Sequence, residues 1–334
     1  NLAGLFHIRK DFNFRGKEAK LSFGGAQTYK ERDYVIRNFA LNIRNIPLTG
    51  DPNEIFQPEN LWPRNGEISS GTTYEAPFIP VNPNQFNATT SNTAGYLSAE
   101  IPLFEDFNLK LGLRAENYIQ NYTGQDQLGA NVLDNETVLE SFDLFPSVNI
   151  IYNITPIQNL RVSYSKTIAR PSFKELSYAE IYDPISGRTF IGGLFRDAND
   201  IDGVEYWDGQ LTSTDIYNYD LRWEIFLPKG QMLSLSGFYK KFSRPIEIVQ
   251  YATQTGSFQP RNVGDGEVFG AEAELRVNLG TLLGESLNSL HFSSNFTLTR
   301  SRIKLSKTEY DSRLANARTG QEISEYRDMA GQAP

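Results

Sequence analysis

Residues 217–227 read YNYDLRWEIFL, and this stretch decides the fold. Its odd positions are apolar or aromatic, whereas the even positions from 218 to 224 are Asn, Asp, Arg and Glu. Because successive side chains of a β-strand point to opposite faces, this alternation predicts a strand with one apolar face and one charged face. The turn residues Pro228-Lys229-Gly230 follow, and residues 231–239 (QMLSLSGFY) repeat the alternation. The two runs together predict a β-hairpin.

The same period of two recurs along the whole chain. Leu, Val, Ala and aromatic residues alternate with polar residues over 109–116, 160–165, 269–279 and 290–299. The sequence therefore predicts an all-β fold with about ten long strands. We place them at residues 2–12, 18–32, 91–103, 107–121, 139–153, 158–169, 213–227, 230–249, 265–279 and 288–303.

The connections between these strands alternate in length. Short ones are expected at residues 13–17, 104–106, 154–157, 228–229 and 280–287, and long ones at 33–90, 122–138, 170–212, 250–264 and from 304 onward. Strict alternation puts every short turn at one end of the sheet and every long loop at the other. Antiparallel transmembrane β-barrels of the outer membrane have this arrangement, with short periplasmic turns and long extracellular loops.

The energy of burying charge indicates which face of such a barrel would meet lipid. Arg or Lys facing lipid at the membrane midplane costs roughly 2–4 kcal/mol, so Arg222, Arg276 and Lys110 are expected on a wet inner wall. A soluble antiparallel sheet would show the same alternation. Two features favour the barrel: the runs reach 12 to 15 residues, against roughly 5–6 in ordinary strands, and Tyr, Phe and Trp gather near the strand ends.

Composition excludes several other classes of protein. The chain of 334 residues has no cysteine and only two histidines, which excludes a disulfide scaffold and thiol catalysis and disfavours a multi-histidine metal site. Its net charge of -8 argues against a nucleic-acid partner. No apolar run is long enough for a membrane-spanning helix. The one helix that we expect is a short charged one within Leu305–Ala317.

Several motifs occur in an order that carries more information than the alternation alone. Residues 161–176 read RVSYSKTIARPSFKEL, residues 218–224 NYDLRWE, residues 236–247 SGFYKKFSRPIE and residues 266–275 GEVFGAEAEL. The sequence ends with MAGQAP at 329–334. From about residue 90 to 334 this series resembles the barrel of TonB-dependent receptors of the outer membrane, especially the Bacteroidota-type branch.

The resemblance implies a 22-stranded barrel filled by an N-terminal plug domain, and active uptake of a scarce nutrient driven through the inner-membrane TonB complex. Ten strands are too few for that barrel, and neither a plug, a TonB box nor a signal peptide is visible in the sequence. We therefore expect residues 1–334 to be a partial barrel domain, with the plug and the C-terminal strands outside this chain.

For the parent protein the sequence leads to three hypotheses. The first is an outer-membrane receptor and transporter for TonB-dependent uptake of a siderophore, an oligosaccharide or a similar ligand, with no enzyme activity. Its expected partners are outer-membrane lipid, the TonB complex through the plug, and the small-molecule or oligosaccharide ligand. The second is a passive porin-like channel, and the third is a soluble all-β binding or adhesion protein.

Candidate binding residues come from the expected loop 170–212. Its aromatic residues could form a stacking platform for a substrate, or they could pack the loop itself; those that we single out are Tyr182, Phe190, Tyr206 and Trp207. The same loop carries Asp197, Asp200 and Asp202, which resemble a calcium loop only loosely because Ile201 stands where an oxygen ligand is needed. An acidic loop without metal is the simpler interpretation, so we expect no metal and no cofactor.

Overall fold

Long antiparallel strands make up most of the molecule. The computed structural model describes residues 1–334 except 38, 76–81, 198–201, 203–204, 251–255 and 330–334. Its main sheet has eleven strands in the order β1-β2-β5-β6-β7-β8-β11-β12-β15-β16-β17, and every neighbouring pair is antiparallel. Strand order thus follows chain order, as in an up-and-down barrel wall.

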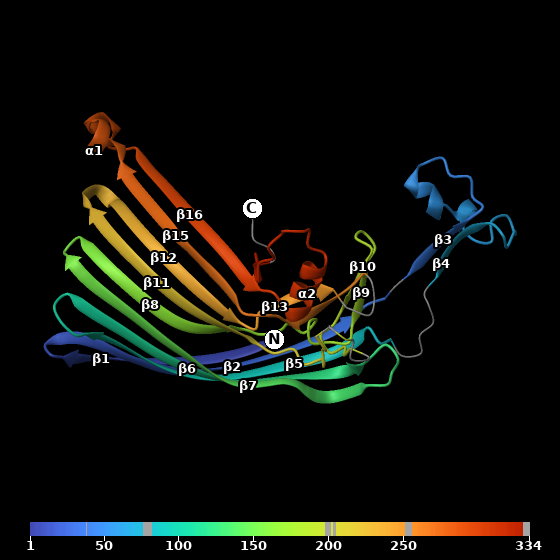
Figure 1. Cartoon of the computed structure of the whole chain (residues 1–334), viewed down its shortest axis with the longest axis horizontal. Coiled ribbons are helices and arrows are strands. Elements are labelled where there is room, and N and C mark those ends of the chain that lie inside the picture. Colours follow the sequence, from blue (N-terminus) through green and yellow to red (C-terminus); the bar gives the residue numbers. More distant parts are fainter. Residues whose placement is uncertain (38, 76–81, 198–201, 203–204, 251–255, 330–334) are drawn as a thin grey trace.

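Ten of these eleven strands are long, and they confirm the predicted strands. They span β1 (Leu2–Phe14), β2 (Lys17–Val35), β5 (Gln85–Pro102), β6 (Phe107–Gln125), β7 (Val132–Thr155), β8 (Gln158–Ala169), β11 (Thr214–Leu227), β12 (Gln231–Ser243), β15 (Gly266–Asn278) and β16 (His291–Lys304), while β17 is Tyr326–Arg327. The described sheet curves strongly without closing on itself, and it forms one side of a barrel (Figure 1).

Two of the predicted boundaries were wrong. Residues 122–138 are not a long loop, because β6 and β7 continue to Gln125 and from Val132. Register shifts at Gln120/Asn121 and Tyr122/Gly124 break the sequence alternation there while the ladder of hydrogen bonds continues. The predicted strand 230–249 also divides. Pro245 lacks an N–H, so β12 ends at Ser243 and β13 (Ile246–Gln250) joins another sheet.

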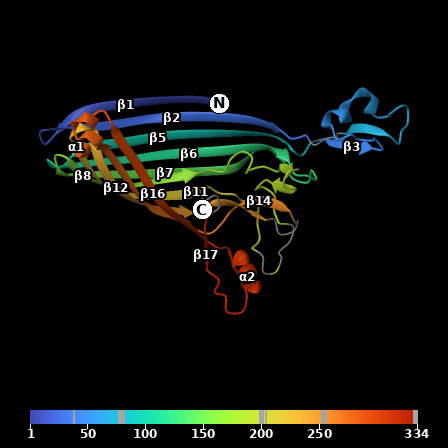
Figure 2. The ribbon, with the colours of Figure 1, turned by 90° about the horizontal axis from the view of Figure 1, so that it is seen from above.

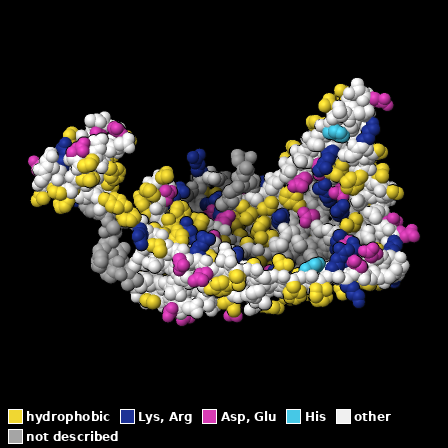
Figure 3. Space-filling model, turned by 180° about the vertical axis from the view of Figure 1, so that it is seen from behind, with side chains coloured by type: hydrophobic (Ala, Val, Ile, Leu, Met, Phe, Trp, Pro, Cys, Tyr) yellow, Lys and Arg dark blue, Asp and Glu magenta, His cyan; other side chains and the backbone are white. Residues whose placement is uncertain are grey.

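The two faces of the main sheet differ as predicted. Leu221 and Leu298, on the outer face, are 52% and 61% exposed, and neighbouring outer positions such as Leu97, Leu113 and Leu235 are also exposed. A contiguous exposed apolar face of this extent is typical of a surface that meets a membrane or a partner. Charged side chains lie on the other face and gather along the hollow of the curved sheet (Figure 3). We call these two faces the outer face and the inner wall.

Long connections fold onto the inner wall at one end of the strands. There, β13, β14 (Ser257–Asn262), β10 (Arg188–Ile191) and β9 (Glu180–Asp183) form a four-stranded sheet, which lies on the concave side of the main sheet together with the helix α2 (Lys307–Ala315) (Figure 1). The buried core is also at this end, where loop residues pack on β5, β6 and β7; it comprises Phe86, Ala88, Tyr122, Leu139, Leu176, Tyr178, Ala179, Leu194 and Leu211.

The remaining connections are compact. The helix α2 confirms the helix expected within Leu305–Ala317, and Ser306 caps it by accepting a hydrogen bond from the Glu309 N–H. The turn after β15 contains the short helix α1 (Leu279–Leu283). Strands β3 (Ala40–Arg44) and β4 (Gly71–Glu75) pair in a small unit that stands beyond the ends of the long strands (Figure 2). Among the described residues, no helix is long and apolar enough to cross a membrane.

The two faces of β16 provide a direct test of the assignment of lipid and lumen. Leu298→Arg places a cation on the outer face, whereas Thr297→Arg, one residue earlier, places it on the inner wall opposite Glu272. In the full-length protein we expect Leu298→Arg to cost roughly 2–4 kcal/mol of folding free energy in a bilayer. Thr297→Arg should be nearly neutral. Refolding titrations into lipid vesicles, read by heat-modifiable gel mobility, measure both, and equal losses would contradict the assignment.

Candidate functional site

Arg170 is a firmly anchored charged residue of the inner wall near the loops. It follows the last residue of β8, and Pro171 behind it cannot donate to the ladder, so the chain leaves the sheet here. Its guanidinium donates from Nη1 to Glu116 at 2.8 Å and from Nη2 to Asp143 at 2.9 Å. It also lies 4.4 Å from the centre of the Tyr118 ring. Arg170 therefore joins the loop that follows β8 to the facing strands β6 and β7.

A hollow of about 770 Å³ opens beside Arg170 on the inner wall. We call it the mouth hollow, because it lies at the end of the strands that carries the long loops. Its walls come mainly from β2, β5, β6 and the segment 168–174, and they combine cationic, aromatic and neutral polar residues with one acidic residue, Glu31. These include Lys30, Arg32, Tyr34, Phe86, Thr90, Asn92, Tyr118, Gln120, Arg170, Phe173 and Lys174. Its volume is within the range of small-molecule binding sites.

Gln120 has an unusual environment in this hollow. Its side chain is 0% exposed, and its Oε1 accepts a hydrogen bond from the Tyr118 hydroxyl at 3.0 Å. The amide nitrogen Nε2 has no hydrogen-bond partner among the described residues. Because buried amide groups in folded proteins are nearly always paired, this nitrogen is suited to donate to a bound molecule.

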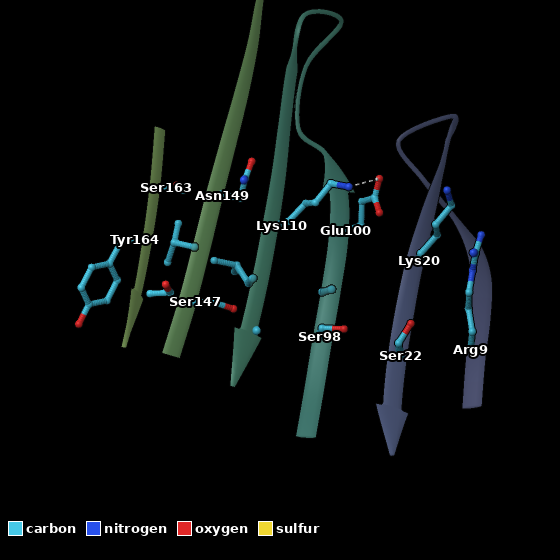
Figure 4. A pocket seen from close by; sticks show the side chains of 15 residues that line it. Arg9, Lys20, Ser22, Ser98, Glu100, Lys110, Ser147, Asn149, Ser163 and Tyr164 are labelled. Atoms are coloured by element: carbon cyan, nitrogen blue, oxygen red, sulfur yellow. Dashed lines mark ion pairs between the residues drawn. The ribbon is translucent and has the colours of Figure 1, made fainter. Parts of the chain in front are cut away.

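A second hollow of about 420 Å³ lies further along the same inner wall. It follows a row of small residues that are register partners on five neighbouring strands: Ser22, Ser98, Gly112, Ser147 and Ser165. A Cβ atom at Gly112 would meet the Ser147 Oγ at 2.5 Å, so a larger residue there would require the Ser147 hydroxyl to move. Charged side chains border the row, and Figure 4 shows Arg9 and Lys20 beside the ion pair of Lys110 with Glu100 (3.3 Å).

Two of the four predicted binding aromatics are held within the loop structure. The Trp207 indole N–H donates to the Gly193 carbonyl at 2.9 Å, and Arg261 lies 5.4 Å from the Trp207 ring. Phe190 on β10 packs against Phe258 on β14, with ring centres 6.0 Å apart. These contacts join two loops that are distant in sequence.

The other two aromatics are open to solvent. Tyr182 on β9 is 57% exposed and Tyr206 is 47% exposed. None of the four lines the mouth hollow. Their role in binding stays a prediction, and Tyr182 and Tyr206 have the free ring surface that such a role requires.

The three aspartates of the possible calcium loop have separate environments. Asp197 is buried and accepts hydrogen bonds from Arg261, at 2.8 Å to Oδ1, and from the Trp207 N–H, at 2.8 Å to Oδ2. Its oxygens are thus engaged in joining the loops. Asp202 is exposed, and Asp200 lies outside the described residues. Within the described part of the chain, no group of three or more His, Cys, Asp or Glu side chains could hold a metal ion.

Loop carboxylates near β9 differ in their electrostatics. Burial raises the pKa of Glu180, and no described residue donates a hydrogen bond to its carboxylate. The pKa of Asp183 is lowered, chiefly by the hydrogen bond from the Ser186 hydroxyl and also by the Ile185 N–H. Burial likewise raises the pKa of the nearby Tyr178 hydroxyl. Burial therefore favours the protonated form of Glu180, whereas hydrogen bonds favour the ionised form of Asp183.

Comparison with known families identifies the family of this chain. Residues 5–326 match the family described as TonB dependent receptor-like, beta-barrel. The chain belongs to the TonB-dependent receptor family. Such receptors reside in the outer membrane, and the strand, face and loop arrangement described above fits that location. No curated protein sequence matches the chain.

Solved receptors share the fold at low sequence identity. FpvA from Pseudomonas aeruginosa, in complex with a heterologous pyoverdine and iron, is 16% identical over 90% of this chain and 32% of its own, with a TM-score of 0.54. The ferric citrate transporter FecA is 12% identical over 90% of this chain and 35% of its own, with a TM-score of 0.53. The TonB-dependent receptor chain thus spans about a third of the length of these solved structures.

Sequence reasoning missed the residues of the mouth hollow. The segment containing Arg170 carries part of the family resemblance, but the sequence predicted only that a strand ends there. Tyr118 and Gln120 were placed on a strand without a role. The available signal was their parity, because every second residue on β6 from Lys110 to Gln120 points to the inner wall, although parity alone does not show which of them meet a loop.

The contact between Arg261 and Asp197 predicts how the loops are held together. In the full-length receptor, Arg261→Gln leaves the buried Asp197 carboxylate without its cation, which costs roughly 3–5 kcal/mol, and should release Trp207. We expect a red shift of tryptophan fluorescence and faster loop proteolysis. Arg188→Gln, which removes an exposed cation near Phe258, serves as the control. An unchanged spectrum in Arg261→Gln would contradict this role.

The raised pKa of Glu180 predicts a pH dependence of loop stability. The folded loop holds the Glu180 proton more tightly than the unfolded loop does, so loop stability should decline as pH rises from about 4.3 through the raised pKa. Glu180→Gln removes this decline and should protect the loop better at neutral pH. Hydrogen exchange of residues 176–183 in the full-length receptor, at pH 4 and pH 7.5, measures the effect. Identical pH profiles for wild type and variant would exclude it.

Proposed function

We propose that this chain is the partial barrel of an outer-membrane receptor that takes up a scarce nutrient with energy from the TonB complex. The observation that carries the proposal is the polar inner wall, with the mouth hollow near the loops and the row of small residues further along it. A ligand captured at the mouth hollow would meet small or polar side chains along this wall.

The rest of the receptor would complete the barrel and supply the plug that contacts TonB. Two features support this extension. The sheet ends at open edges, β1 on one side and the short β17 on the other, and open edges are not stable in lipid. The chain also spans only about a third of each solved receptor described above. Outer-membrane lipid would cover the apolar outer face.

The size of the mouth hollow and the ligands of similar receptors support a proposal for the ligand class. A siderophore, an oligosaccharide or a similar small molecule would suit a hollow of this size, and the two solved receptors described above bind pyoverdine with iron or transport ferric citrate. No bond-making chemistry is assigned to the site, in which Arg170 is engaged in ion pairs with Glu116 and Asp143. We propose transport without enzyme activity.

Uptake by cells separates active transport from the alternatives. Deleting the parent gene should slow growth on limiting nutrient, and deleting the cell's TonB should have the same effect. A variant with Ser98→Trp, which fills the row of small residues, should reduce uptake at least several-fold, while Ser98→Thr should not. Uptake that persists without TonB would indicate a passive channel, and a parent protein found free of membranes would indicate a soluble binding protein.

A further inference from the structure

Four basic residues and one acidic residue, Glu31, line the mouth hollow, and within the described part of the chain only Arg170 of the four is paired with acids. Among the described residues, Lys30, Arg32 and Lys174 form no ion pair, although all three line the hollow. Several other cations of the inner wall are paired, namely Arg114 with Glu116, Arg222 with Glu224 and Glu274, and Lys110 with Glu100. Three unpaired cations at one hollow are unexpected in a chain whose net charge is -8.

The register of the strands places two of these cations on the inner wall. Lys30 pairs with Thr90 in the ladder, and Thr90 pairs with Gln120, so the three side chains form one row across β2, β5 and β6. Arg32 is two residues further along β2 and therefore faces the same way. Lys174 approaches from the loop after β8. The cations thus surround the hollow from two sides.

Neutral groups of the hollow add directional and apolar contacts. The buried Gln120 Nε2 and the Asn92 Oδ1 both lack a hydrogen-bond partner among the described residues. Tyr34 stacks on the buried Phe86 with ring centres 5.0 Å apart and provides a supported aromatic ring at the same site. A molecule bound here would gain hydrogen bonds, ring contacts and charge neutralisation together.

We propose that the mouth hollow binds a small organic anion that carries several carboxylates or similar oxyanions. Lys30, Arg32 and Lys174 pair with the anionic groups, the Gln120 amide donates a hydrogen bond, and Tyr34, supported by Phe86, contacts the carbon skeleton. The inference rests on the proposed function, since it names the ligand class of the receptor's own capture site. Two sources share this chemistry: an iron chelate built from carboxylates and an acidic oligosaccharide.

Equilibrium binding to the purified full-length receptor in detergent tests the proposal without any need for TonB. The acidic probes are ferric citrate and digalacturonate, and the neutral probe is the corresponding galactose disaccharide, each followed by calorimetry. We expect at least one acidic probe to bind, with an affinity that weakens as salt is raised, and the neutral probe not to bind. Binding of ferric citrate alone assigns the chelate, and binding of digalacturonate alone assigns the acidic sugar.

Variants locate the binding in the hollow. Lys30→Gln with Arg32→Gln should weaken binding of the acidic probe at least tenfold, and Gln120→Leu should weaken it as well. The matched control, Lys240→Gln with Arg318→Gln, removes the same charge from an inner-wall strand and a loop outside the hollow, and should bind as wild type. Heat-modifiable mobility identifies variants that fold. Binding by neither acidic probe, equal binding of the neutral disaccharide, or unchanged binding in the Lys30/Arg32 variant overturns the proposal.

The outcomes separate this inference from the proposed function. Charge-selective binding combined with TonB-independent uptake would leave the anion site standing and overturn active transport. TonB-dependent uptake without charge-selective binding would overturn the anion site and leave active transport standing.

Discussion

One constraint governs the whole structure: a backbone that crosses lipid must pair every N–H and C=O group within the protein. A sheet satisfies it only through long, continuous ladders, and ten strands of 12 to 24 residues provide them here. Long strands in turn fix the direction of each side chain, because parity decides the face. The exposed leucines of the outer face and the ion pairs of the inner wall are both consequences of this geometry.

The loop end of the sheet is stabilised differently, by a buried apolar core like that of a water-soluble protein. There the connection after β8 folds back onto the inner wall and buries Tyr122, Leu176 and Leu211. Arg170 and the pair of Arg261 with Asp197 hold this arrangement through charge-assisted hydrogen bonds. The mouth hollow lies between these two parts of the structure, with barrel strands on one side and the folded loop on the other.

The fold could be predicted from sequence largely because its period is so simple. Ten strands, their order and the charged face all follow from alternation in stretches such as 217–227. Prediction failed where a bulge or a proline interrupts that period, at Asn121–Gly124 and at Pro245. The site was harder. Trp207 attracted attention as a loop aromatic and Asp197 as part of an acidic run, yet their shared partner Arg261 lies on another loop segment far along the chain. Gln120 became recognisable only through the partner that it lacks.

The central claim is that odd and even residues of one strand lie in different solvents. Single cysteines placed in turn at positions 217–227 of the full-length receptor, labelled with a nitroxide and reconstituted in lipid vesicles, measure this directly. Relaxation of the nitroxide by lipid-soluble oxygen should peak at positions 219, 221, 223 and 225 and drop at 220, 222 and 224 between them. Relaxation without a period of two, or a peak of oxygen accessibility at the even positions, would contradict it.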